Sequence, residues 1–158
     1  IENLTGSGFN DTLTGDTGAN LLTGGGGNDS LTGGGGADTL IGGLGTDTAD
    51  YSASAAVTIS LATGLGSGGD AAGDVLSGIE VLIGSGNNDS LAGDSGANSL
   101  FGGSGNDTLE GGGGADSLDG GSGTDLASYA GSAAGVSVNL THRAWQRRRC
   151  GGRCAGRV

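Results

Sequence analysis

The sequence contains no proline, no methionine and no lysine, and it has only one tryptophan, two tyrosines and two phenylalanines. Leu, Ile, Val and Phe together make up about a fifth of its 158 residues, and the net charge is −11. This composition is typical of disordered chains, because ordering costs about 1.5 kcal/mol per residue and few apolar side chains offset it. An ordinary globular core is therefore excluded, and a folded state needs a further source of free energy.

Positive charge is missing from the first 142 residues. All six arginines lie between Arg143 and Arg157, whereas all 17 acidic residues lie at or before Asp125. A surface with only negative charge repels nucleic acid and anionic lipid and attracts cations. No apolar stretch approaches the ~20 residues needed to span a bilayer. The composition therefore predicts neither a nucleic-acid partner nor membrane insertion.

Catalytic motifs are also missing. His142 is the only histidine, so a His-based triad or a zinc cluster has little to build on. Residues 64–69 fit G-x-G-x-x-G, but glycines break the segment that follows, so no helix is expected to support a dinucleotide site. We expect this chain to be no enzyme itself. Because it begins at Ile1, lacks methionine and shows no signal peptide, we expect a fragment of a longer protein.

The residue in excess is glycine, which occupies 40 positions. Residues 1–51 align without a gap with residues 79–129, and most aligned pairs are identical. Within each copy an Asp or Asn recurs every nine residues, followed two positions later by an apolar residue. These recurring positions are Asp11, Asn20, Asp29, Asp38, Asp47, Asp89, Asn98, Asp107, Asp116 and Asp125. A period of nine does not fit an α-helix and predicts a short strand followed by a long turn.

The turns have the composition of a cation site. Segments such as GGSGND (102–107) need several residues with positive φ, which glycine adopts at little cost. Glycine also leaves carbonyl oxygens uncovered, and the aspartate adds a carboxylate; Ca²⁺ takes six to eight such oxygens. Two nonapeptides complete one lap of 18 residues, and successive laps stack as parallel strands about 4.8 Å apart. This places Leu13 under Leu31 and Leu22 under Leu40.

At these residues the sequence resembles the RTX, or haemolysin-type, calcium-binding repeats, whose pattern is G-G-x-G-x-D-x-U-x. The nonapeptides GGGGNDSLT (24–32), GGGGADTLI (33–41) and GGSGNDTLE (102–110) fit it. Residues 51–82 also resemble the spacer of serralysin-like C-terminal regions. The resemblance implies a parallel β-roll, calcium-dependent folding and type I secretion.

The predicted fold class is all-β, a parallel β-roll (β-solenoid) with two short arrays of 18-residue coils joined by a spacer with short strands. Alternation at Val57, Ile59 and Leu61 predicts a spacer strand. Ala49 and Ala127 replace leucine, which predicts that each array tapers there. The predicted boundaries are 1–51 for the first array of five nonapeptides, 52–78 for the spacer, 79–129 for the second array and 130–141 for the start of a second spacer.

The resemblance places each Ca²⁺ between turns one lap apart, with roughly three ions per array. Asp29 and Asp107 would each serve two ions, whereas Asn20 and Asn98 bring no charge and should bind more weakly. The acidic ligands expected are Asp11, Asp29, Asp38, Asp47, Asp89, Asp107, Asp116 and Asp125. The glycines expected to line the sites are Gly24, Gly25, Gly27, Gly33, Gly34, Gly36, Gly43, Gly45, Gly102, Gly103, Gly105, Gly111, Gly112, Gly114, Gly121 and Gly123.

Four acids outside the nonapeptide pattern have two interpretations each. Asp70 and Asp74 belong either to a solvated turn, the favoured interpretation, or to another ion site. Glu2 and Glu80 precede the two arrays, and either cap an open end or lie on a plain surface.

Residues 142–158 differ from everything before them, since they hold every Arg, both Cys, the Trp and the His. Codons for this segment, read one base later, can encode a copy of spacer residues 63–78. We therefore predict a frameshifted, disordered tail without a selected function; the alternatives are a basic anion-binding tail or a Cys150–Cys154 metal or redox pair.

The sequence thus predicts a calcium-binding β-roll module of a secreted bacterial protein, extracellular or at the cell surface. Its expected partners are calcium ions and, through the longer protein, a type I secretion system. Two alternatives remain: a C-terminal appendage of an extracellular, protease-like enzyme, or a repeat segment of an adhesin or surface-layer protein.

Overall fold

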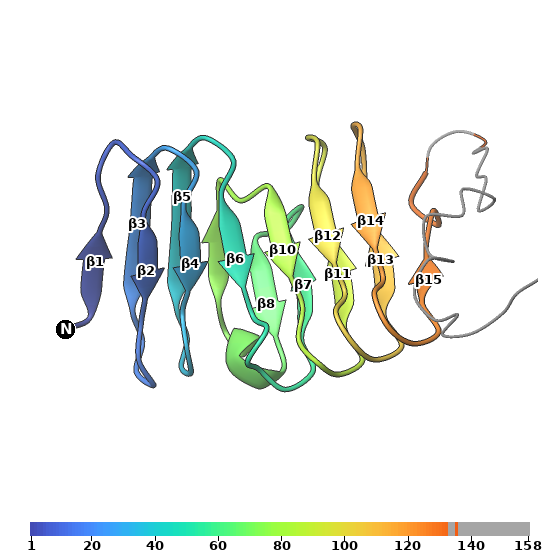
Figure 1. Cartoon of the computed structure of the whole chain (residues 1–158), viewed down its shortest axis with the longest axis horizontal. Helices are drawn as coiled ribbons and strands as arrows, with labels where there is room; N and C mark the ends of the chain where they lie inside the picture. Colours follow the sequence, from blue (N-terminus) through green and yellow to red (C-terminus); the bar gives the residue numbers. More distant parts are fainter. Residues whose placement is uncertain (133–134, 136–158) are drawn as a thin grey trace, which may run out of the picture.

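The computed structural model describes residues 1–132 and 135, and it confirms the predicted β-solenoid (Figure 1). Short strands, most of them three residues long, alternate between the two faces of a flattened coil within each array. The described residues contain one 3₁₀ turn, η1 (Gly69–Ala71), and no helix long and apolar enough to cross a membrane. The predicted tail 142–158 and most of the second spacer lie outside the described residues.

The strands form a nine-stranded and a six-stranded sheet. In order across the first, they are β1 (Asn3–Thr5), β3 (Leu21–Gly26), β5 (Thr39–Leu44), β9 (Val75–Ser77), β8 (Leu65–Ser67), β7 (Thr58–Ser60), β11 (Ser90–Ala92), β13 (Thr108–Glu110) and β15 (Leu126–Ala127). Across the second they are β14 (Ser117–Asp119), β12 (Ser99–Phe101), β10 (Val81–Ile83), β6 (Thr48–Asp50), β4 (Ser30–Thr32) and β2 (Thr12–Thr14).

The strand register is 18 residues within each array, as the repeat predicts. Leu13 pairs with Leu31 in β2 and β4, and Leu22 pairs with Leu40 in β3 and β5. The central residue of each three-residue strand points inward, because successive side chains of a strand alternate between its faces. The resulting core is a thin aliphatic seam, in which Leu22, Leu31, Leu40, Leu82 and Leu100 are fully buried.

In the six-stranded sheet the two arrays stack directly on each other, so the taper predicted at Ala49 is wrong. Strand β6 pairs with β4 on one side and with β10 on the other, with Ala49 opposite Leu82. Ala49 is fully buried there. The smaller side chain therefore packs inside the coil. Figure 1 shows β6 between β4 and β10.

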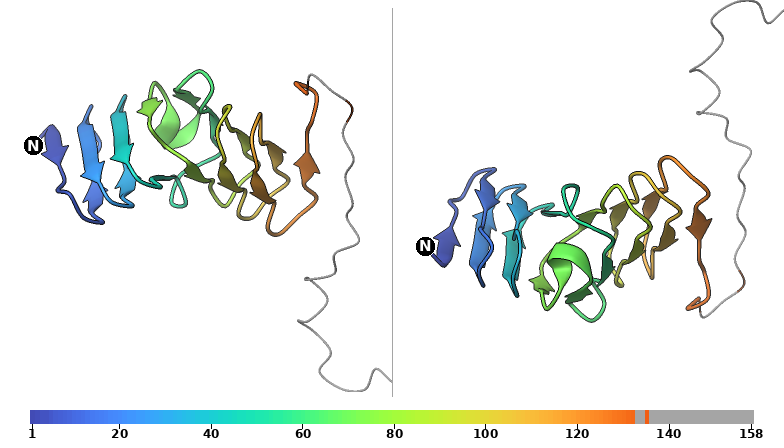
Figure 2. Two further views of the ribbon diagram at one scale, coloured as in Figure 1. Left: turned by 90° about the horizontal axis from the view of Figure 1, so that it is seen from above. Right: turned by 90° about the horizontal axis from the view of Figure 1, so that it is seen from below.

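The spacer fills the other sheet at this junction. Strands β7 and β8 pair antiparallel, and so do β8 and β9, while β9 continues parallel from β5 and β7 continues parallel to β11. The predicted spacer strand at 57–61 is confirmed as β7, with Val57 and Ile59 buried. Figure 2 shows the η1 turn at the side of the coil where the two arrays meet.

This spacer exchanges the sheets between the two repeat copies. Strand β1 belongs to the nine-stranded sheet, whereas β10, its equivalent in the second copy, belongs to the six-stranded sheet. Edge I, the edge that holds the turns 6–11, 24–29 and 42–47, therefore continues into the turns 93–98 and 111–116. Edge II holds the remaining turns, which are 15–20, 33–38, 84–89, 102–107 and 120–125.

Candidate functional site

Each turn ends in an Asp or Asn that is tied to the equivalent residue one lap away. The backbone N–H of Asp11 donates to Oδ1 of Asp29, and the N–H of Asp29 donates to Oδ1 of Asp47, both at 2.8 Å. The same bond joins four further pairs, at 2.8–3.1 Å: Asn20 with Asp38, Asp89 with Asp107, Asn98 with Asp116, and Asp107 with Asp125. The structure thus brings together all six pairs that the repeat pattern singles out.

The second carboxylate oxygen is left without a donor in the middle of the stacks. Oδ2 of Asp29, Asp38, Asp47 and Asp107 is buried and has no hydrogen-bond partner. These four residues are at most 2% exposed. A buried carboxylate oxygen that lacks a partner is costly, so this arrangement calls for a positive ion.

The first turn of each array differs because serine replaces its second glycine. Oδ2 of Asp11 accepts hydrogen bonds from the backbone N–H and the hydroxyl of Ser7. Oδ2 of Asp89 accepts the same two bonds from Ser85. These two carboxylates therefore already have partners within the protein.

The unpaired oxygens face gaps that exist because the first residue of each turn is glycine. A Cβ added to Gly24 would lie closer than 3.0 Å to Oδ2 of Asp29 and to the carbonyl oxygen of Gly42, one lap away. A Cβ added to Gly102 would likewise lie closer than 3.0 Å to Oδ2 of Asp107 and to the carbonyl oxygen of Gly120. Each gap thus lies between a carboxylate oxygen of one turn and a carbonyl oxygen of the next, which suits a hard cation such as Ca²⁺.

The other glycines allow the turns to stack so closely. Twelve of the expected glycines have positive φ: Gly25, Gly27, Gly34, Gly36, Gly43, Gly45, Gly103, Gly105, Gly112, Gly114, Gly121 and Gly123. A Cβ at Gly25 or Gly27 would strike the backbone of Ser7 or Phe9 one lap below. At the remaining four expected glycines, an added Cβ would lie within 3.0 Å of a carboxylate side chain of the turn; these are Gly24, Gly33, Gly102 and Gly111.

Burial disfavours the charged form of these carboxylates. Desolvation raises the pKa of Asp38 and of Asp107 above the usual value for aspartate, although a backbone N–H donated to each opposes it. Neighbouring acids raise both pKa values further. Since residues 1–142 contain no Lys or Arg, no side-chain cation in that stretch offsets the buried charge.

Two acids at the junction, Asp74 in the spacer and Glu80 just after it, replace turn aspartates in the stack. The N–H of Asp38 donates to Oδ1 of Asp74 at 2.8 Å, and the N–H of Asp47 donates to Oε2 of Glu80 at 2.9 Å. Asp74 is fully buried, so the favoured interpretation of a solvated turn is wrong for this residue. Its spacing contained the signal, because Asp74 lies three nonapeptides after Asp47 in the same phase.

The gaps also involve residues that the predicted ligand set omits. A Cβ at Gly42 would meet Oδ2 of Asp47 and the carbonyl oxygen of Gly78. Both could have been included from their spacing, because Gly42 lies nine residues after Gly33 and Gly78 lies 36 residues, or four nonapeptides, after Gly42. Glu2 is exposed, unlike its repeat equivalent Glu80.

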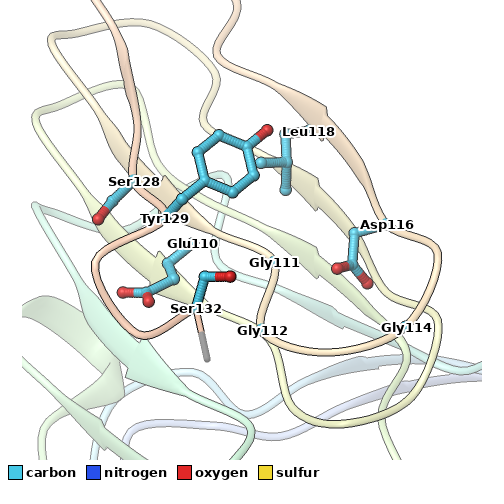
Figure 3. A pocket seen from close by; sticks show the side chains of 9 residues that line it. All are labelled: Glu110, Gly111, Gly112, Gly114, Asp116, Leu118, Ser128, Tyr129 and Ser132. Carbon is cyan, nitrogen blue, oxygen red and sulfur yellow. The ribbon is translucent and has the colours of Figure 1, made fainter. Parts of the chain in front are cut away.

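The last turns are more open than the middle of the stack. Asp116 lies in a depression that is also lined by Glu110, Tyr129 and Ser132 (Figure 3). Oδ1 of Asp116 accepts the N–H of Asn98, and its carboxylate lies beside the glycines at 111–114. Among the described residues, no three His, Cys, Asp or Glu side chains cluster, so each gap offers at most a pair of carboxylates and otherwise backbone oxygen.

Comparison with protein families gives one result. The model of the RTX calcium-binding nonapeptide repeat matches in four copies, at residues 1–31, 14–49, 74–109 and 93–127, which together exceed half of the chain. The matches leave residues 50–73 uncovered and do not support a serralysin-like spacer. Comparison with curated proteins gave no match. The chain therefore belongs to the RTX calcium-binding nonapeptide repeat family.

Proposed function

We propose that this chain is a module that folds when calcium binds in its glycine turns, outside the cell. The observation that carries the proposal is the set of four buried aspartate oxygens without hydrogen-bond partners, in a stretch that contains no Lys or Arg. Without a cation, stacking the turns buries negative charge and brings acids together. With Ca²⁺, ion binding stabilises only the stacked state, so binding free energy becomes folding free energy.

Ca²⁺ fits the gaps better than Mg²⁺ does. The oxygens at each gap come from a flexible glycine turn, and Ca²⁺ accepts six to eight oxygens in variable geometry. Mg²⁺ requires a tight octahedron and retains its waters. The proposed ligands are the turn aspartates and asparagines with carbonyl oxygens of the turn glycines, and roughly three ions per array occupy the gaps between laps.

The affinity typical of extracellular calcium modules supports folding outside the cell. Extracellular calcium modules bind at about 10⁻⁴–10⁻³ M, which keeps such a chain loose in a low-calcium cytosol and folds it after export. The family is typically secreted, and this supports export by a type I system. The module would serve a longer secreted bacterial protein, either as the C-terminal appendage of an extracellular enzyme or as a repeat segment of an adhesin.

Far-ultraviolet circular dichroism tests the proposal directly. In excess EGTA the chain should lack β-structure, and millimolar CaCl₂ should produce a β-sheet spectrum that EGTA reverses. MgCl₂ at the same concentration is the control and should have little effect. A complete β-sheet spectrum in EGTA would contradict calcium-dependent folding.

A further inference from the structure

The turn 42–47 on edge I is not followed by a nonapeptide turn. Residues 78–80, at the boundary between the spacer and the second array, lie over it instead, because β10 pairs with β6 directly after them. The N–H groups of Glu80 and Val81 both donate to the carbonyl oxygen of Asp47, at 3.1 and 2.9 Å. The spacer backbone is therefore held against this turn as closely as one nonapeptide turn is held against another.

Glu80 takes the place of a turn aspartate in this contact. Its Oε2 accepts the N–H of Asp47 at 2.9 Å, just as Oδ1 of Asp29 accepts the N–H of Asp11 at 2.8 Å. Glu80 also lies 18 residues before Asn98, and the N–H of Ser99 donates to its carbonyl oxygen. The acidic column of edge I thus continues through the junction from Asp47 to Glu80 and on into the second array.

A gap with a buried, unpaired oxygen lies between Asp47 and the spacer. Asp47 is 0% exposed, and its Oδ2 has no hydrogen-bond partner. A Cβ on Gly42 would come closer than 3.0 Å both to this oxygen and to the carbonyl oxygen of Gly78. The two oxygens therefore converge on one point, next to an aspartate whose N–H is held by the carboxylate of Glu80.

We propose that this gap is a calcium site built from Asp47, Glu80 and the Gly78 carbonyl, and that its ion joins the two arrays. The inference rests on the proposed calcium-dependent folding. It adds ligands from outside the nonapeptide pattern, since Gly78 and Glu80 belong to no nonapeptide. Two carboxylates without a side-chain cation, together with backbone oxygen, favour a divalent ion with hard ligands.

The test compares Glu80→Gln with Glu2→Gln. The two glutamates occupy equivalent positions of the repeat, but Glu2 is exposed and accepts no hydrogen bond from a turn aspartate in the described structure. Glutamine at position 80 keeps an oxygen acceptor for the Asp47 N–H and removes the charge. Bound calcium per chain is measured by equilibrium dialysis at 1 mM free Ca²⁺ with metal analysis.

The Glu80→Gln chain should bind one ion fewer than the wild type, and the Glu2→Gln chain the same number. If both variants bind as many ions as the wild type, the junction site is absent although calcium binding is intact. If the wild type binds no calcium, the proposed function itself fails.

Gly42→Ala provides a second variant in case Glu80→Gln does not fold. Its backbone φ is not in the left-handed region, so the added methyl group acts by filling the gap. Its loss of one ion, with a β-sheet spectrum retained in calcium, would support the site. Full occupancy in Gly42→Ala would overturn it.

Discussion

The hydroxyl of Tyr51 donates a 2.8 Å hydrogen bond to Oδ2 of Asp74, and both side chains are buried. Oδ1 of Asp74 accepts the N–H of Asp38, so both carboxylate oxygens of Asp74 have donors from the protein. Asp29, in contrast, has one oxygen without a donor. The hydroxyl of Tyr51 therefore gives Oδ2 of Asp74 a hydrogen-bond donor of the kind that Oδ2 of Asp29 lacks.

Tyr51→Phe should destabilise the calcium-loaded protein by about 1–3 kcal/mol, because it leaves a buried carboxylate oxygen without its donor. Urea unfolding at saturating calcium, followed by circular dichroism, measures this change. Tyr129→Phe is the matched control, since Tyr129 is the repeat equivalent and is 42% exposed. Equal unfolding midpoints for the two variants would mean that the Tyr51–Asp74 bond contributes little.

Asp107→Ala should raise the calcium midpoint of folding more than Asn98→Ala does. Oδ1 of Asp107 accepts the N–H of Asp89, and its Oδ2 faces the gap toward the Gly120 carbonyl oxygen in the lap of Asp125, so loss of the carboxylate weakens two gaps. Asn98 is bonded to one such partner, Asp116, and its amide contributes no charge. Calcium titrations of both variants by circular dichroism give the two midpoints. A midpoint that rises more in Asn98→Ala would contradict ion binding between laps at Asp107.

Stability should depend on pH with opposite sign in the absence and presence of calcium. Burial raises the pKa of Asp38, Asp74 and Asp107, so the calcium-free folded state binds protons more tightly than the unfolded state does. The stabilisation of the folded state by this tighter proton binding is fully present below the unfolded pKa of about 4. It is lost as the pH rises through the higher pKa values of the folded state.

Acidifying the chain in EGTA from pH 7 to about pH 4 should therefore increase its β-content. In calcium, the same acidification should reduce β-content, because protons compete with the ion for the carboxylates. Circular dichroism in parallel pH titrations distinguishes the two signs. A loss of β-content on acidification in EGTA would show that carboxylate burial does not limit calcium-free folding.

Neighbouring glycines should respond differently to alanine. Gly25 has φ 110° and an added Cβ would strike the Ser7 carbonyl oxygen, so Gly25→Ala should cost at least about 1–2 kcal/mol. Gly26 has no positive φ, and a Cβ there would make an ordinary 3.7 Å contact with Gly8. Gly26→Ala should be neutral or stabilising by up to about 1 kcal/mol. Urea unfolding at saturating calcium tests this pair, and equal losses would contradict the stacking geometry.

Deletion of residues 142–158 should leave the calcium midpoint unchanged, because the family matches end at residue 127. Calcium titration of the shortened chain checks this expectation, and a large loss of affinity would show that the tail contributes to the sites. The coding DNA tests the frameshift independently: its codons, read one base later, should spell a spacer-like peptide.

The nine-residue period was sufficient to predict the regular part of the fold. A strand of three residues, a turn of six and a lap of 18 are local properties, repeated in every nonapeptide. They determine that Leu13 lies under Leu31 and that Asp11 lies next to Asp29, because stacking in register repeats the same contact. The 18-residue lap predicted which turn residues lie one lap apart, and the resemblance to the RTX repeats placed the ions between them.

The junction was decided by tertiary structure. Tyr51 and Asp74 are 23 residues apart, and Asp47 and Glu80 are 33 apart, so the 18-residue lap relates neither pair. Their contacts depend on how the spacer packs Val57, Ile59 and Ala71 into the core while β6 stacks on β10. Periodic sequence determines neighbours where the same contact recurs, whereas a single, non-repeating junction is selected by the packing of its own side chains.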